Sequence, residues 1–162
     1  MKKPNFLSIL RTLRKEQIDF IVVGGVSGVL QGAPITTFDL DIVHSRDPGN
    51  VERLLAGLEI LGAHYRIPGA ERKKPARSHL RSSGHQLLMT RAGPLDLLGT
   101  IGHGYGYDDL IGKTLEMEIG KGLQVRVLKL ETLIELKAQT ASVKDKAALI
   151  VLRRTLQHRT AK

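Results

Sequence analysis

Two aspartates one residue apart, Asp39 and Asp41, are the side chains in this sequence that most directly suggest chemistry. They lie in an apolar run that predicts a strand over residues 37–43. Side chains alternate along a strand, so both would point to the same face, with Cα atoms roughly 6.6 Å apart. Two like charges on one face repel unless a cation lies between them, and carboxylate oxygens suit Mg²⁺. Because their neighbours are apolar, we expect metal ligands here rather than a solvated strand face.

A glycine pair precedes these acids at the end of another apolar run. Gly24 and Gly25 follow a strand predicted over residues 19–23, and their bare backbone N–H groups could lie against a phosphate. Ser27 either adds a hydroxyl to the phosphates or caps the helix that begins at the glycines. Together with the acids, this turn predicts a metal-dependent site for a nucleoside triphosphate.

Two further residues are candidates for the same site. Asp96 lies between Leu95 and Leu97 in a strand predicted over residues 94–98, so it is either a third metal ligand and general base or a turn residue. Lys137 shares a helical face with apolar side chains. Its ammonium group would either reach the triphosphate or remain in water above a packed stem.

The remaining pattern alternates helices and strands. Residues 66–84 contain many cations and few apolar side chains, which predicts a mobile basic loop. The expected fold is therefore α/β (α+β), a small mixed sheet flanked by helices, in one domain over residues 1–162 with its core at about 17–128. Further strands are predicted at 85–90, 115–119 and 123–127, and helices at 5–16, 24–32 and 47–62, with a C-terminal helical pair at about 130–140 and 143–157.

Composition narrows the function classes. The 162 residues are 41% hydrophobic and 25% charged and contain no cysteine, so disulfides, thiolate zinc sites and cysteine nucleophiles are excluded. No apolar run approaches the roughly 18 residues of a membrane helix, and no signal peptide is evident, so we expect a cytoplasmic protein with no membrane partner. The formal charge of +9 favours polyanions, nucleic acid above all.

From Val23 to Ile42 the sequence resembles the signature of the DNA polymerase beta-like nucleotidyltransferase superfamily. That signature is an apolar residue, Gly-Gly or Gly-Ser, a spacer, and acid–apolar–acid. The similarity extends to the small bacterial abortive-infection (AbiEii-type) proteins through Thr37, residues 93–96, and the tail Leu133–Lys137 with Lys144 and Asp145. The sequence departs from that subfamily at Ile35, where a basic residue is expected.

The resemblance implies transfer of a nucleoside monophosphate from an NTP such as ATP to an acceptor hydroxyl. It implies two Mg²⁺ ions held by Asp39, Asp41 and Asp96, with the triphosphate held by Gly24, Gly25, Ser27 and Lys137. The charge and the cations at residues 72–81 favour an RNA acceptor such as tRNA over a cationic aminoglycoside, and a protein hydroxyl stays open. A toxin with a cognate antitoxin partner is a further possibility, and a catalytically inactive nucleic-acid- or partner-binding module is the alternative.

Overall fold

One mixed β-sheet organises the computed structural model, which describes residues 3–67, 72–140 and 142–160. Within these residues, seven strands follow the spatial order β3-β4-β5-β2-β1-β7-β6. The central strands β2 and β5 run parallel, as do β1 and β7, whereas β1 and β2 are antiparallel. The strands are β1 (Phe20–Val23), β2 (Leu40–His44), β3 (His64–Tyr65), β4 (His85–Thr90), β5 (Gly93–Leu98), β6 (Thr114–Ile119) and β7 (Leu123–Leu128).

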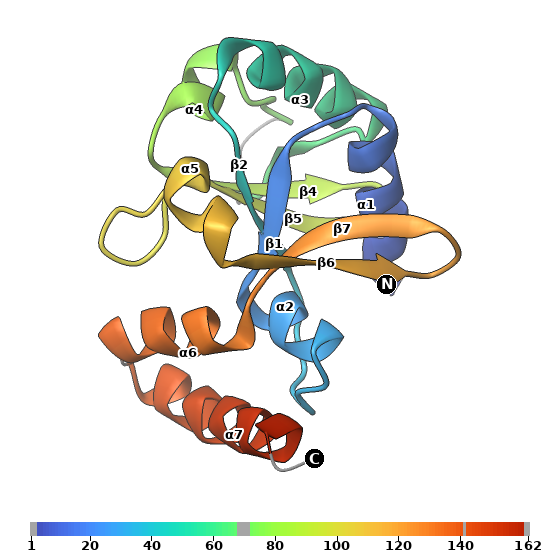
Figure 1. Ribbon diagram of the computed structural model, residues 1–162. Coiled ribbons are helices and arrows are strands. Elements are labelled where there is room, and N and C mark those ends of the chain that lie inside the picture. Colours follow the sequence, from blue (N-terminus) through green and yellow to red (C-terminus); the bar gives the residue numbers. More distant parts are fainter. Residues whose placement is uncertain (1–2, 68–71, 141, 161–162) are drawn as a thin grey trace.

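Helices lie on both sides of the sheet, so the predicted α/β class is confirmed. α1, α3 and α4 lie on one side, and α2, α6 and α7 on the other (Figure 1). Each side has its own buried apolar cluster. The helices are α1 (Phe6–Lys15), α2 (Gly24–Leu30), α3 (Pro48–Ile60), α4 (Arg77–Arg81), α5 (Tyr107–Leu110), α6 (Leu130–Gln139) and α7 (Val143–Thr160), with a short 3₁₀ helix, η1 (Ile111–Lys113).

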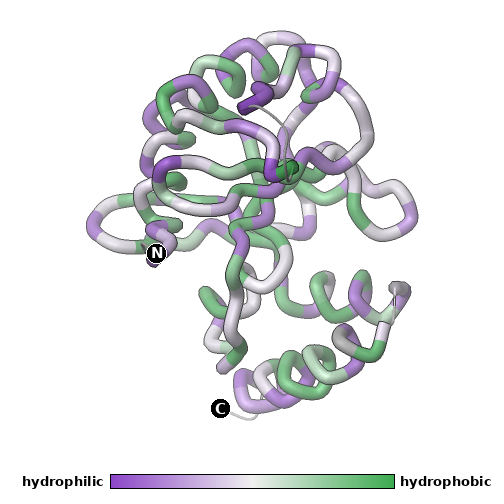
Figure 2. The backbone as a smooth tube through the Cα atoms, turned by 180° about the vertical axis from the view of Figure 1, so that it is seen from behind, coloured by the Kyte–Doolittle hydropathy of each residue, from purple (hydrophilic) through white to green (hydrophobic). Residues whose placement is uncertain are grey.

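The pattern of apolar residues determines which side of the sheet each side chain of β2 points to. In β2, Leu40 and Ile42 are buried in the cluster beneath α1 and α3. Val43 belongs to the cluster beneath α2 and α6. Because side chains alternate along a strand, Asp41 lies on the α2 and α6 side, together with Val43. Figure 2 shows the chain from behind, with hydrophobic and hydrophilic residues interspersed along it, including along the helices at the bottom of the view.

The acidic strand begins later than its sequence predicts. β2 starts at Leu40 rather than at residue 37 because the Thr37 hydroxyl donates a hydrogen bond to the Asp39 carbonyl over 3.0 Å. This local bond closes a turn and competes with strand pairing. Asp39 therefore lies at the entrance to the strand, and Asp41 lies within it.

The basic segment at 66–84 is more ordered than its composition predicts. Residues 68–71 lie outside the described part, but α4 forms beyond them. Arg77 makes an ion pair with Glu52 of α3, and Lys74 lies 3.0 Å from Glu59 of the same helix. The prediction of a loop is wrong for Arg77–Arg81, which form α4 with Leu80 fully buried, whereas residues 72–76 and 82–84 lie outside helices and strands as predicted.

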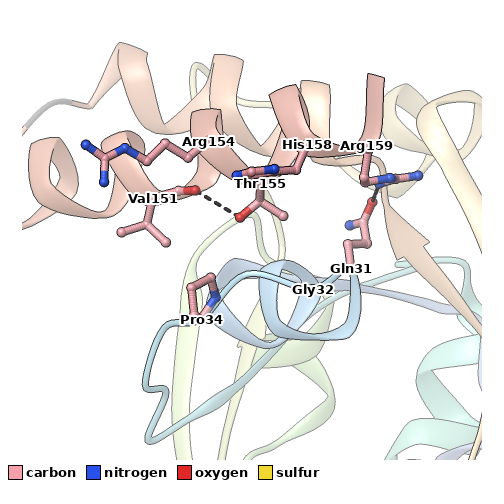
Figure 3. A pocket seen from close by; sticks show the side chains of 8 residues that line it. All are labelled: Gln31, Gly32, Pro34, Val151, Arg154, Thr155, His158 and Arg159. Carbon is pink, nitrogen blue, oxygen red and sulfur yellow. Dashed lines mark hydrogen bonds between the residues drawn. The ribbon is translucent and has the colours of Figure 1, made fainter. Parts of the chain in front are cut away.

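Gln31 ties the C-terminal helices to the sheet. Its side-chain amide donates to the Leu128 carbonyl over 2.8 Å, and its oxygen accepts from the Leu130 N–H over 3.0 Å. Arg159 of α7 donates to the same oxygen over 3.2 Å, beside a cavity of about 480 Å³ (Figure 3). Gln31 is almost fully buried, so these bonds fix where α6 begins and thus where Lys137 lies.

Candidate active site

Asp41 and Asp96 face one another across the two central parallel strands. They are Cα partners in the register between β2 and β5, and their apolar neighbours point to the opposite side of the sheet. Asp96 is 8% exposed and Asp41 is partly buried. The sequence predicted both acids, and the sheet brings them together although they lie 55 positions apart, 96 − 41.

Burial and charge make the ionised form of Asp41 unfavourable. Burial raises the pKa of Asp41 to about 7, and the charge and hydrogen bond of Asp96 and the charge of Asp39 act in the same direction. Lys137 opposes the shift. The site therefore concentrates negative charge in a place where water stabilises it poorly.

Gly24 leaves room for the Asp41 carboxylate. A Cβ atom built on Gly24 would lie 2.3 Å from Asp41 Oδ2, and the backbone φ angle is +64°. Gly25 is similarly crowded, since its Cβ would lie 3.0 Å from the Thr37 hydroxyl. The glycine pair thus allows both the turn into α2 and the close approach of the acidic strand.

Arg66 is the residue that sequence reasoning missed. Its Nη1 lies 2.8 Å from Asp96 Oδ1 and donates a hydrogen bond to the Leu88 carbonyl over 2.7 Å. Arg66 directly follows β3, and its backbone N–H bonds Leu87, the Cα partner of Asp96. The sequence signal was weak, because Arg66 opened a segment rich in cations and nothing marked it as the partner of a buried acid.

A divalent cation fits the pair formed by Asp41 and Asp96. Asp96 Oδ1 is buried and accepts no hydrogen bond, since its contact with Arg66 has the distance but not the direction of one. The donor set is hard oxygen, which suits Mg²⁺. In the part of the chain that the structure describes, no group of three His, Cys, Asp or Glu side chains is placed to hold a metal ion. The structure thus pairs two of the three predicted ligands, with Asp39 at the strand entrance.

Lys137 lies at the mouth of the same site. It lines a cleft of about 130 Å³ together with Gly24 and Leu98, and its ammonium lies 3.7 Å from Asp145 of α7. Partial burial would raise the pKa of Asp145, but the Ser142 hydrogen bond and Lys137 hold it below its usual value. The side chain of Lys144, which the sequence resemblance also includes, lies outside the described set.

Ser27 is fully buried, and its hydroxyl donates to the Gly24 carbonyl over 2.6 Å. In this geometry the hydrogen bond of the hydroxyl stabilises the glycine turn.

Several solved structures share this architecture. The lincosamide antibiotic adenylyltransferase LnuA, solved with lincomycin, superposes with a TM-score of 0.61 at 13% identity, over 94% of this chain and 98% of LnuA. ANT(2″)-Ia, solved in complex with adenylyl-2″-tobramycin, gives 0.58 at 15% identity, over 93% of this chain and 87% of that protein. This is the nucleotidyltransferase fold.

A third protein with the nucleotidyltransferase fold, TM1012 of Thermotoga maritima, is provisionally named a nucleotidyltransferase. It matches with a TM-score of 0.56 at 18% identity, over 94% of this chain and 91% of its own. No protein-family model and no curated protein sequence matches the chain. At such low identity the similarity establishes the fold alone, and the chemistry must be argued from the residues.

Replacing Gly24 with alanine should destabilise the protein through its contact with Asp41. We expect a loss of about 2–4 kcal/mol in urea unfolding, combining backbone strain and steric overlap. Gly104→Ala is the matched control, because Gly104 also has a positive φ, +96°, but nothing lies within 4 Å of its Cβ position. In an Asp41→Ala background the cost of Gly24→Ala should fall toward that of the control, because only the contact with the Cβ of residue 41, at 3.1 Å, remains. An unchanged cost there would contradict the proposed contact.

The raised pKa of Asp41 predicts a specific dependence of stability on pH. Without metal, the folded protein holds a proton on Asp41 up to about pH 7, whereas the unfolded chain releases it near the ordinary aspartate pKa of 3.8. This contribution to stability therefore declines as pH rises from about 4 to 7, by up to about 4 kcal/mol. Asp41→Asn should remove the decline and be more stable than wild type at pH 8. If the stabilities of the two proteins change in parallel across that pH range, the pKa of Asp41 is not raised and the prediction is contradicted.

Proposed function

We propose that this protein is a Mg²⁺-dependent nucleotidyltransferase that transfers a nucleoside monophosphate from an NTP to an acceptor hydroxyl. The observation that carries the proposal is the paired, poorly solvated carboxylates of Asp41 and Asp96 beside the glycine turn. A structural role alone would not favour placing these two acids in register at a poorly solvated position, because the charge of Asp96 raises the cost of ionising Asp41.

Asp39, Asp41 and Asp96 are proposed as the metal ligands, for up to two Mg²⁺ ions. Bound metal would neutralise the acids, activate the acceptor oxygen and stabilise the pyrophosphate leaving group. Asp39 would join the pair from the strand entrance, where its charge already acts on Asp41. Asp96, which is ion-paired with Arg66, is the candidate general base that takes the proton from the acceptor hydroxyl.

The glycine turn and Lys137 are proposed to hold the triphosphate. Gly24 and Lys137 line one cleft, so a phosphate there would meet backbone N–H groups on one side and an ammonium on the other. Ser27 would contribute through the hydrogen bond from its hydroxyl to the Gly24 carbonyl, which stabilises the turn. Such fixed groups position the phosphates and stabilise the charge that develops during transfer.

RNA is the acceptor that the charge favours, because a protein of formal charge +9 attracts polyanions and repels cationic aminoglycosides. LnuA and ANT(2″)-Ia were solved with antibiotic ligands, which makes a small-molecule acceptor the second candidate. A cytoplasmic location and a toxin activity that requires an antitoxin partner belong to the same proposal. For location, the structure shows only that no helix in its described residues could span a membrane.

The test is transfer of α-³²P label from each of the four NTPs, with Mg²⁺ and with bulk RNA or lincomycin as acceptor. Wild type should label RNA, and Asp41→Asn should lose at least about a hundredfold in rate, since it removes one charged group from the reacting centre. The control variant, Glu118→Gln on β6, removes an exposed carboxylate outside the site and should transfer label to RNA at the wild-type rate. Absence of label with every NTP and acceptor, from folded wild type, would favour the non-catalytic binding module.

A further inference from the structure

A basic groove lies between α1 and the turn that joins β6 to β7. Its volume is about 500 Å³. It lies at the side of the sheet covered by α1 and α3, whereas the carboxylates face α2 and α6 (Figure 1). The groove lining is Arg11, Arg14, Lys15, Gly122, Leu123 and Gln124.

The three cations of the groove are exposed and have no acidic partner. None of them makes an ion pair within the described residues, in contrast to Lys74 and Arg77, which are held by glutamates of α3. Two of the nearby acids pair with other arginines: Glu116 lies 3.4 Å from Arg126, and Asp19 lies 3.8 Å from Arg53. The groove therefore presents positive charge that the protein itself does not neutralise.

The turn shapes the groove from the opposite wall. A Cβ on Gly120 would lie 3.1 Å from Arg11 Nη2, so the guanidinium extends from α1 across to the turn. Gly122 has a φ of +73° and nothing within 4 Å of its Cβ position, which leaves its backbone accessible. Compensation of the helix dipole accounts for cations in the last turn of α1, Arg14 and Lys15, but not for Arg11 one turn earlier.

We propose that this groove binds the phosphodiester backbone of single-stranded RNA. The cations lie three and four residues apart on one helix face, about 5–6 Å between Cβ atoms, which is a spacing suited to successive phosphates. Among the described lining residues, Leu123 is the apolar one and is 7% exposed. A protein partner would need an exposed apolar centre, whereas nucleic-acid interfaces are polar and strongly positive.

A smaller polar cavity of about 180 Å³ adjoins the groove, and Arg14 and Gln124 line both. Its lining is of mixed charge, because Asp19 and Glu116 lie there with Arg126, so the cationic surface is confined to the groove. The inference rests on the proposed function in one respect, that the bound RNA is the acceptor, but binding itself requires neither NTP nor catalysis.

The experiment measures binding of a fluorescein-labelled RNA of about 20 nucleotides by anisotropy, without nucleotide, over a range of salt concentrations. The groove variant is Arg11→Gln/Arg14→Gln/Lys15→Gln. The control, Lys129→Gln/Arg153→Gln/Arg154→Gln, removes the same charge from exposed cations at α6 and α7 that have no ion pair in the described residues. Circular dichroism and melting curves establish that both variants fold.

The groove variant should lose at least about tenfold in affinity, and its slope of log affinity against log salt should fall by roughly 2. The control should lose less than about threefold. Equal losses in both variants would overturn the proposal in favour of bulk charge, and so would wild type that does not bind RNA. Equal binding of polyglutamate through the same three cations would assign the groove to an acidic protein instead.

Label transfer separates this result from the proposed function. If wild type transfers label but the groove variant binds RNA normally, the groove inference is wrong and the transferase stands. If the groove variant alone loses RNA binding and no protein transfers label, the groove inference stands and the transferase is wrong.

Discussion

The mutual repulsion of Asp41 and Asp96 is the constraint on which the site depends. The parallel pairing of β2 and β5 places the two acids side by side, and apolar packing on the far face of the same strands prevents a shift in register. A one-residue slip of β2 would turn Asp41 into the apolar cluster beneath α1 and α3 and move Leu40 and Ile42 out of that cluster. Gly24 then gives the carboxylate room, Arg66 forms an ion pair with Asp96, and Lys137 favours the ionised form of Asp41.

Much of this could be predicted from sequence because the signals are local. Apolar periodicity placed the longer helices and six of the seven described strands within a few residues, but not β3, α4, α5 or η1. The glycine pair with Asp39, Asp41 and Asp96 gave the candidate site. The start of β2 was missed because a single hydroxyl, that of Thr37, bonds the Asp39 carbonyl. α4 was missed because its five residues carry one buried apolar side chain, Leu80, among cations.

Arg66 and Gln31 show what a sequence without its fold cannot provide. Arg66 matters because β3 lies beside β4, which brings its guanidinium to Asp96 from 30 positions away, 96 − 66. Gln31 matters because its amide satisfies buried backbone groups about 100 residues later. Neither residue belongs to a motif. The same holds for the cations of α1, which make no ion pair within the described residues, whereas Asp19 and Glu116 pair with other arginines.

The central claim, that these carboxylates exist to hold a metal-bound nucleotide, is tested most directly by the melting temperature with Mg²⁺ and a non-hydrolysable NTP analogue. Added together at about 100 times the dissociation constant, they should stabilise wild type by about 2.7 kcal/mol, a shift of several degrees. Either ligand alone should do much less, and Asp41→Asn should show no shift. A wild-type melting temperature that does not respond, or an equal response from Asp41→Asn, would contradict the account.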